Sequence, residues 1–200
     1  MKFLLSTAVA VMMMTTVASA QHSSAHSAIG IKGGANFYNL NSDPDNTSLK
    51  TSIGFHVGAL GHVHLGTKWA LQPELTYSSQ GAKFEMPGDD IKLKLGYINV
   101  PILVQYMFDN GFRIQAGPQV GFLINAKTKL GGTDTDVKDD FTEVDIAASA
   151  GLSYVDPKSG VGIDARYNLG LNNIAEGGGP SLKNRGAQVG LFFLFPKAKK

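Results

Sequence analysis

Apolar residues alternate with polar residues or glycine along eight stretches of the chain after residue 28. A period of two is typical of strands that have one apolar face and one polar face. The connections between these stretches are alternately long and short. The long ones are polar and lie at 39–50, 79–92, 127–140 and 172–183. The pattern predicts strands at 29–38, 51–65, 68–78, 93–108, 112–126, 141–154, 161–171 and 184–195.

None of these stretches is apolar enough for a membrane-spanning helix. In a bilayer every backbone N–H and C=O group needs a partner within the protein, so strands cross it only as a closed barrel. The pattern therefore predicts an all-β fold, an eight-stranded antiparallel up-and-down transmembrane β-barrel. Long loops would then face the outside of the cell and short turns the periplasm. Three prolines within the strands predict β-bulges, because proline removes one bond of the ladder; they are Pro73, Pro101 and Pro118.

The first 20 residues have the features of a signal peptide, with Lys2 before an apolar core and an A-x-A cleavage site at Ala18-Ser19-Ala20. A buried helix or membrane anchor is the alternative, which the short apolar run disfavours. We expect a signal peptide at 1–20, a disordered leader at 21–28, an outer-membrane β-barrel at 29–196 and a basic tail at 197–200. The predicted localisation is the outer membrane of a Gram-negative cell envelope.

Composition narrows the possible functions. Loss of Lys2 with the signal would lower the formal net charge from +2 to +1, which gives no basic footprint for nucleic acid. The absence of cysteine excludes disulfides and thiolate metal sites. A soluble, lipocalin-like ligand-binding barrel would also alternate, but its polar face would meet water and gain nothing from many glycines.

The polar face carries glycine together with a balanced set of charges. Glycine leaves room for long side chains in a narrow lumen, and eight strands enclose an interior that side chains just fill. Buried charges require partners, so we expect an ion-pair network and no open pore. The expected network consists of Lys32, Glu74, Arg113, Asp145, Asp164 and Arg166.

Aromatic residues cluster at the ends of the predicted strands, as in the two girdles of a transmembrane barrel. General enrichment of aromatic residues in β proteins is the alternative. The girdle at the periplasmic rim would contain Trp69, Tyr106, Phe108, Phe112, Tyr154 and Phe195. The girdle at the outer rim would contain Phe37, Phe55, Tyr77 and Phe122.

Several segments together resemble the PorT-like outer-membrane β-barrel family of Bacteroidetes-type bacteria. They are 30–37 (GIKGGANF), 71–75 (LQPEL), 77–81 (YSSQG), 97–101 (YINVP), 115–119 (QAGPQ) and 165–171 (ARYNLGL). The resemblance implies an outer-membrane barrel without an assigned reaction, in a family whose namesake is implicated in protein secretion. Such barrels usually end at an aromatic residue that the assembly machinery reads, whereas here five residues follow Phe195.

We therefore expect a small, monomeric outer-membrane barrel with a structural, surface-interaction or secretion-accessory role, and not an enzyme. Its expected partners are outer-membrane lipids and lipopolysaccharide, the barrel-assembly machinery, and an unknown surface or secretion partner that binds the long loops. No cofactor and no nucleic acid are expected.

Three sharper hypotheses remain beside this one. His62 and His64 share a strand face and are weak candidates for a metal site, against a role in filling the lumen. A membrane-embedded lipid-modifying enzyme would need a nucleophile or base at the outer rim, where no histidine accompanies Ser78, Ser79 and Glu85. The acidic third loop could hold Ca²⁺ but lacks a known loop pattern, so a solvated loop is favoured; its carboxylates are Asp134, Asp136, Asp139 and Asp140.

Overall fold

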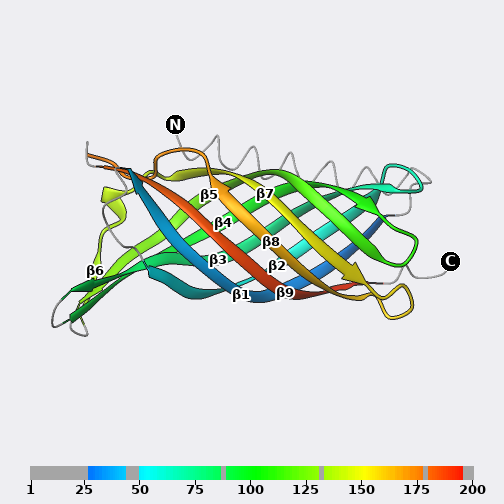
Figure 1. The fold of residues 1–200 in the computed structure, drawn as a ribbon, viewed down its shortest axis with the longest axis horizontal. Coiled ribbons are helices and arrows are strands. Elements are labelled where there is room, and N and C mark those ends of the chain that lie inside the picture. The colour runs from blue at the N-terminus through cyan, green and yellow to red at the C-terminus, as the bar shows by residue number, and fades with distance from the viewer. Residues whose placement is uncertain (1–26, 44–49, 87–88, 131–132, 178–179, 196–200) are drawn as a thin grey trace.

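The computed structural model describes residues 27–43, 50–86, 89–130, 133–177 and 180–195 (Figure 1). The signal peptide, most of the leader and the basic tail lie outside these ranges, and the first strand begins at Ser27 rather than at residue 29. The described part contains nine strands and one short 3₁₀ helix. They are β1 (Ser27–Asp43), β2 (Lys50–His64), β3 (Trp69–Met86), β4 (Asp89–Met107), β5 (Phe112–Leu130), β6 (Thr133–Asp136), η2 (Lys138–Asp140), β7 (Val144–Val155), β8 (Val161–Gly170) and β9 (Ser181–Leu194).

Eight of the strands form a closed antiparallel barrel, as the alternation predicts. Strands that follow one another along the chain are paired, and β1 pairs with β9 to close the ring. The short strand β6 is outside the ring and pairs with the end of β5. Within the described residues, no helix is long and apolar enough to span a membrane.

The barrel has its apolar residues on the outside. Leu191 is 61% exposed and Ile163 is 56% exposed, although the two lie side by side on paired strands. The inward neighbours on the same strands, such as Arg166 and Gln188, are buried. This arrangement suits a lipid surrounding and is the reverse of a soluble, lipocalin-like barrel.

Two facing glycines show why the inner wall needs residues without side chains. Gly34 of β1 pairs with Gly190 of β9. A Cβ atom added to Gly34 would overlap the carbonyl oxygen of Val189 and lie 2.9 Å from the His56 ring. Glycine therefore permits the close approach of β1 and β9 at this position and leaves room for the His56 ring in the lumen.

The chain extends further beyond the barrel at one end than at the other (Figure 1). The turn end carries the short connections after β2, β4 and β7, at 65–68, 108–111 and 156–160. The loop end carries the other four connections, and strands continue there beyond their expected limits. The loops expected at 79–92 and 127–140 are wrong, because β3 runs to Met86, β4 starts at Asp89 and β5 runs to Leu130.

The prolines do not produce the expected bulges. Pro101 pairs with Gln119, and the same register resumes at Val104 and Ala116. The register also continues unchanged past Pro73 and Pro118, because a proline can lose one ladder bond without an inserted residue. The shifts occur elsewhere, between Gly96 and Tyr97 in the β4–β5 pair and between Thr51 and His56 in the β2–β3 pair.

Candidate functional site

The loop end forms a folded unit, which we call the loop-end extension (residues 80–86, 89–95, 125–130, 133–143, 172–177 and 180–183). It contains buried apolar side chains: Leu93 and Leu95 of β4 are buried, and Ala126 of β5 is fully buried. They belong to one apolar cluster that lies above the polar lumen. The buried members are Leu40, Ala82, Leu93, Leu95, Tyr97, Leu123, Ala126 and Ile174.

The connection between β8 and β9 is fastened across this cluster. Ile174 is fully buried, and its backbone N–H donates to the carbonyl of Leu182 at 2.8 Å. The backbone N–H of Thr142 donates to the Ile174 carbonyl at 2.8 Å, so two loops are joined over the barrel. The Asn173 carboxamide oxygen accepts from the backbone N–H of Leu182 at 2.8 Å and fixes the loop further.

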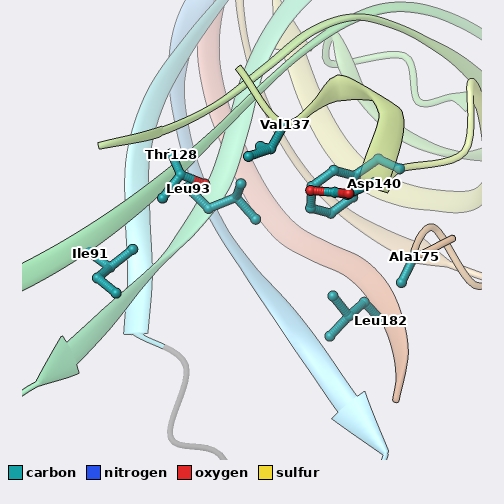
Figure 2. Close-up of a pocket in the computed structure, with 8 residues that line it drawn as sticks. Ile91, Leu93, Thr128, Val137, Asp140, Ala175 and Leu182 are labelled. Atoms are coloured by element: carbon teal, nitrogen blue, oxygen red, sulfur yellow. The ribbon is translucent and has the colours of Figure 1, made fainter. Parts of the chain in front are cut away.

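A cavity of about 310 Å³ opens in the loop-end extension. Figure 2 shows side chains from β4, β5, the segment around η2, the β8–β9 connection and the start of β9 arranged around it. Asp140 is the one acidic residue of a mainly apolar lining, so the cavity suits an apolar group better than a charged one. The lining residues are Ile91, Leu93, Thr128, Val137, Asp140, Phe141, Ala175 and Leu182.

In the lumen below, four of the six charged residues expected to form a network bond to one another. Lys32 of β1 lies 3.3 Å from Glu74 of β3 and 3.1 Å from Asp164 of β8. Arg166 of β8 holds Glu74 through two hydrogen bonds of 2.9 and 2.7 Å and lies 2.9 Å from Asp164. Two cations and two anions balance, and their side chains are at most 3% exposed.

This four-residue group joins strands from different sides of the barrel. Strands β3 and β8 are separated in the sheet by β2, β1 and β9, so the Glu74–Arg166 contact crosses the lumen. Amides extend the contact: Gln72 donates to Glu74 at 2.7 Å, and Gln105 donates to Gln72 at 2.8 Å. The lumen is therefore crossed by direct side-chain bonds at this level.

Arg113 and Asp145 do not join the group, which corrects the expected six-residue network. Arg113 pairs with Ser153 near the turn end, whereas Asp145 is the second residue of β7, near the loop end. Among the described residues, no ion pair to either one is found. Asp145 instead accepts a hydrogen bond of 2.9 Å from Asn184. A shared face places charges in one lumen but at different heights along it.

The two candidate histidines are in contact with each other. The ring centres of His62 and His64 are 4.7 Å apart in an edge-on arrangement, and His62 is 1% exposed. In the described part of the chain, no group of three His, Cys, Asp or Glu side chains is placed to hold a metal ion. Neither the histidine pair nor the loop carboxylates therefore belong to such a group; the carboxylates are Asp134, Asp136, Asp139 and Asp140.

Of the residues named for a lipid-modifying site, Ser78 lies inside the barrel. Ser78 is fully buried, and its hydroxyl oxygen accepts a hydrogen bond of 3.0 Å from Asn36. It faces the lumen, because its neighbour Tyr77 faces outward beside Phe55. The side chain of Glu85 lies outside the described part. Ser78 is therefore not exposed on the outer surface of the barrel.

Aromatic residues at the turn end form a continuous chain on the outer surface. The ring centres of Trp69 and Tyr106 are 5.1 Å apart, and those of Tyr106 and Phe108 are also 5.1 Å apart. Phe112 follows at 6.0 Å from Phe108. Tyr154 and Phe195 are exposed near this end, and the Phe195 backbone N–H donates to Ile29 across the barrel seam.

The other expected girdle is also on the outer surface, nearer to the loop end. Phe37, Phe55 and Phe122 are 40%, 55% and 37% exposed. Tyr77 is half-buried beside Phe55, with 5.6 Å between the ring centres. The two sets thus bracket an apolar outer belt.

Comparison with known proteins gives the same architecture. A model of the family described as "outer membrane protein beta-barrel domain" matches residues 19–176. The solved structure of Neisserial surface protein A is similar, with a TM-score of 0.57 and 16% identity over 85% of this chain and 99% of that one. No curated protein matches the sequence.

The attachment invasion locus protein Ail of Yersinia pestis is also similar. It has a TM-score of 0.52 and 19% identity over 84% of this chain and 97% of that one. A second structure of Ail contains the heparin analogue sucrose octasulfate and matches with the same TM-score of 0.52. At these identities the likeness concerns the fold alone.

Proposed function

This chain belongs to the outer membrane protein beta-barrel domain family and is located in the outer membrane, and from that premise we propose that it is a closed, monomeric barrel that acts through surface interaction. In this proposal the barrel is a rigid support, and the loop-end extension is the surface that contacts a partner outside the cell. No reaction is assigned to it.

The charge group across the lumen is the observation that carries the proposal. Lys32, Glu74, Asp164 and Arg166 bond across a space that eight strands make only wide enough for side chains. The apolar cluster of the loop-end extension covers the same axis nearer the outside. Both features argue against a conducting path and in favour of a supporting role.

The loop-end extension has the properties of a binding surface. Loops on a rigid scaffold commonly carry binding, and here they are held by paired strands and by the bonds of Ile174 and Asn173. The cavity of about 310 Å³ offers an apolar recess within that surface. A preorganised surface loses less conformational freedom when it binds.

The named neighbours and the PorT-like resemblance lead to two forms of this role. Neisserial surface protein A and Ail are described as a surface protein and an attachment protein, which accords with direct contact outside the cell. The PorT-like segments favour a secretion-accessory role, in which the partner is a component or a cargo of secretion. The seam contact of Phe195 fits recognition of the last strand by the assembly machinery.

Site-specific photo-crosslinking in intact cells tests the surface role. A photoreactive residue would replace Asp139, which is exposed at the loop end, or Ser159, which is exposed at the turn end. We expect a discrete crosslinked product from position 139 and its absence from position 159. If both positions give the same product, or if position 139 and exposed Glu176 give none, the proposal is wrong.

Conductance in planar bilayers tests the closed lumen separately. We expect the purified barrel to show no stable open steps. Stable, ion-selective steps from the folded protein would overturn the closed-lumen part of the proposal, while the crosslinking result would still decide the surface role.

A further inference from the structure

Six lysines lie in register on four neighbouring strands of the loop end. Lys50 of β2 pairs with Lys83 of β3, which pairs with Lys92 of β4, which pairs with Lys129 of β5. One row nearer to the barrel, Lys94 of β4 pairs with Lys127 of β5. We call these six residues the lysine rows (Lys50, Lys83, Lys92, Lys129, Lys94 and Lys127).

The lysine rows point away from the barrel axis. Side chains alternate along a strand, and the neighbours Leu93, Leu95 and Ala126 are buried in the apolar cluster. Lys92, Lys94 and Lys127 are accordingly exposed. The rows therefore face sideways, over the surface that surrounds the barrel, rather than into the cavity of Figure 2.

Their height places them just above the apolar belt. On β5 the outward residues Phe122 and Ile124 are 37% and 44% exposed, and Lys127 follows them. On β4 the outward series runs from Ile98 through Gly96 to Lys94. Four residues span roughly 13 Å along a strand, or about 9 Å along the membrane normal at a tilt of about 45°. Lysines at this height above the apolar belt would lie in the headgroup layer of the membrane.

Such a row is unfavourable without counter-charges, because like charges directly opposite each other on paired strands are destabilising. Within the described parts of these strands, acidic residues occur at the margins of the rows. Asp134 and Asp136 lie opposite Lys129 and Lys127 on the edge strand β6. Glu85 pairs with Asp90 one step nearer to the tip of the β3–β4 hairpin. The centre of the lysine rows thus presents positive charge towards the surrounding membrane surface.

We propose that the lysine rows bind the phosphate groups of a phosphorylated glycolipid of the outer leaflet, of the lipid A class. Lysine acts as a point charge for phosphate, and lysines near an anionic membrane surface each contribute to attraction. The lipid source is favoured over a soluble polyanion because the rows face sideways and apolar residues for acyl chains lie directly beneath them. This lateral site stands whether or not the loop-end extension binds a protein partner.

Lipid binding to the mature, folded barrel in phosphatidylcholine nanodiscs tests the proposal. The probes are bis-phosphorylated lipid A and the same lipid without phosphates, and the variant is K92Q/K94Q/K127Q/K129Q. The control variant K68Q/K158Q/K183Q removes three charges from exposed positions away from these rows. Heat-modifiable migration on gels verifies that each variant is folded.

We expect wild type to prefer the phosphorylated lipid and the row variant to bind it at least about tenfold more weakly, because it lacks four lysines that each attract an anionic surface. The control should stay within about twofold of wild type, because its charges lie away from the site. Equal binding by the row variant, no preference for phosphate, or equally tight binding of soluble tripolyphosphate would each overturn the proposal.

A salt series on wild type alone covers the case in which the row variant does not fold. Binding to phosphorylated lipid A should weaken steeply between 0.05 and 0.5 M salt, on the order of the screening expected for several exposed charges. Binding that does not change with salt would contradict the proposal.

Discussion

The barrel wall and the loop-end extension are built from the same strands but have opposite polarity. On the barrel part of β4, Ile98 points outward and Asn99 is buried inside. On the extension part of the same strand, Lys94 points outward and Leu95 is buried inside. The inward and outward positions keep their alternation, and only the chemistry on each face is exchanged.

The exchange teaches that the surrounding medium, and not the strand, decides which face is apolar. Where lipid surrounds the barrel, apolar residues face outward and polar residues bond to one another within. Where water surrounds the extension, apolar residues turn inward to form a core, as in a soluble protein. The exchange coincides with the register shift between Gly96 and Tyr97.

The polar interior of the barrel should be the most sensitive region. Glu74→Gln would leave Lys32 and Arg166 with Asp164 as the one remaining carboxylate of their group. Breaking a buried ion pair from one side costs about 3–5 kcal/mol. We expect urea unfolding in lipid vesicles to show a loss of this size. The exposed Glu143→Gln is the matched control, and a similarly small effect of both changes would contradict the network's role.

A charged side chain should destabilise the lipid-facing wall but not the outer surface of the extension. Leu191→Arg would place a cation on the outer face beside Gly33 and Ile163, at about 2–4 kcal/mol if the site is near the midplane. The outward position of Lys94 in the extension should tolerate exchange of its side chain with an effect under about 0.5 kcal/mol, as is usual for surface sites. Unfolding in vesicles measures both variants. Tolerance of Leu191→Arg would mean that this face does not meet lipid.

The core of the extension should behave like the core of a soluble protein. Leu95 is 1% exposed, and Leu95→Ala should cost about 2–5 kcal/mol of local stability. We expect faster proteolysis within the extension while the barrel keeps its heat-modifiable migration. Leu169→Ala, on the lipid face, is the control, and it should leave the cleavage rate unchanged. Cleavage that is no faster in Leu95→Ala would show that the apolar cluster does not hold the extension together.

The aromatic chain at the turn end should contribute less. Trp69 packs edge-on against Tyr106, and such pairs contribute roughly 0.5–1.5 kcal/mol beyond their buried area. Trp69→Leu keeps an apolar side chain at the rim and should cost about 1 kcal/mol in vesicle unfolding. A double-mutant cycle with Tyr106→Leu measures the pair, and strictly additive losses would show that the two rings do not interact.

The smallest effect should come from the turn after β7, outside the lipid. The Ser159 hydroxyl and the backbone N–H groups of Lys158 and Ser159 donate to the Asp156 carboxylate, which lowers its pKa from the ordinary value of 3.8. A lowered folded-state pKa contributes stability above the unfolded-state pKa, and that contribution is lost as the pH falls through the folded-state pKa. NMR titration should give a midpoint below 3.8 for Asp156, and Ser159→Ala should raise it. A midpoint that Ser159→Ala leaves unchanged would refute this cause.

The alternation predicts the barrel, the number of strands in its ring and the direction of its faces, because one medium acts along the whole wall. It does not predict the loop-end extension, because the reversal makes residues such as Lys92 and Lys129 look like part of a loop. The prediction of β-bulges at the three prolines was wrong for a related reason. Alternation shows which face of a strand a residue lies on, but not its height along the barrel axis. For that reason Arg113 and Asp145 were expected in one network with Glu74.

The candidate surface was predicted only as a set of long loops. Leu93 and Leu95 carried a signal for it, since they continue the inward series of β4 with apolar residues. Ile174 gave no comparable signal, because its burial depends on pairing with Leu182 and Thr142, which lie far from the strand pattern. The cavity lining therefore required the structure.

Spin-label accessibility along the outward positions of β5 tests the reversal of polarity most directly. Single labels at Ile114, Phe122, Ile124, Lys127 and Lys129 would be compared in vesicles for collisions with oxygen, which enriches in lipid, and with a water-soluble nickel complex. We expect lipid-type accessibility from Ile114 through Ile124 and water-type accessibility at Lys127 and Lys129. Water-type accessibility at Ile114 and Phe122, or lipid-type accessibility at both lysines, would contradict a boundary between media at this point of the strand.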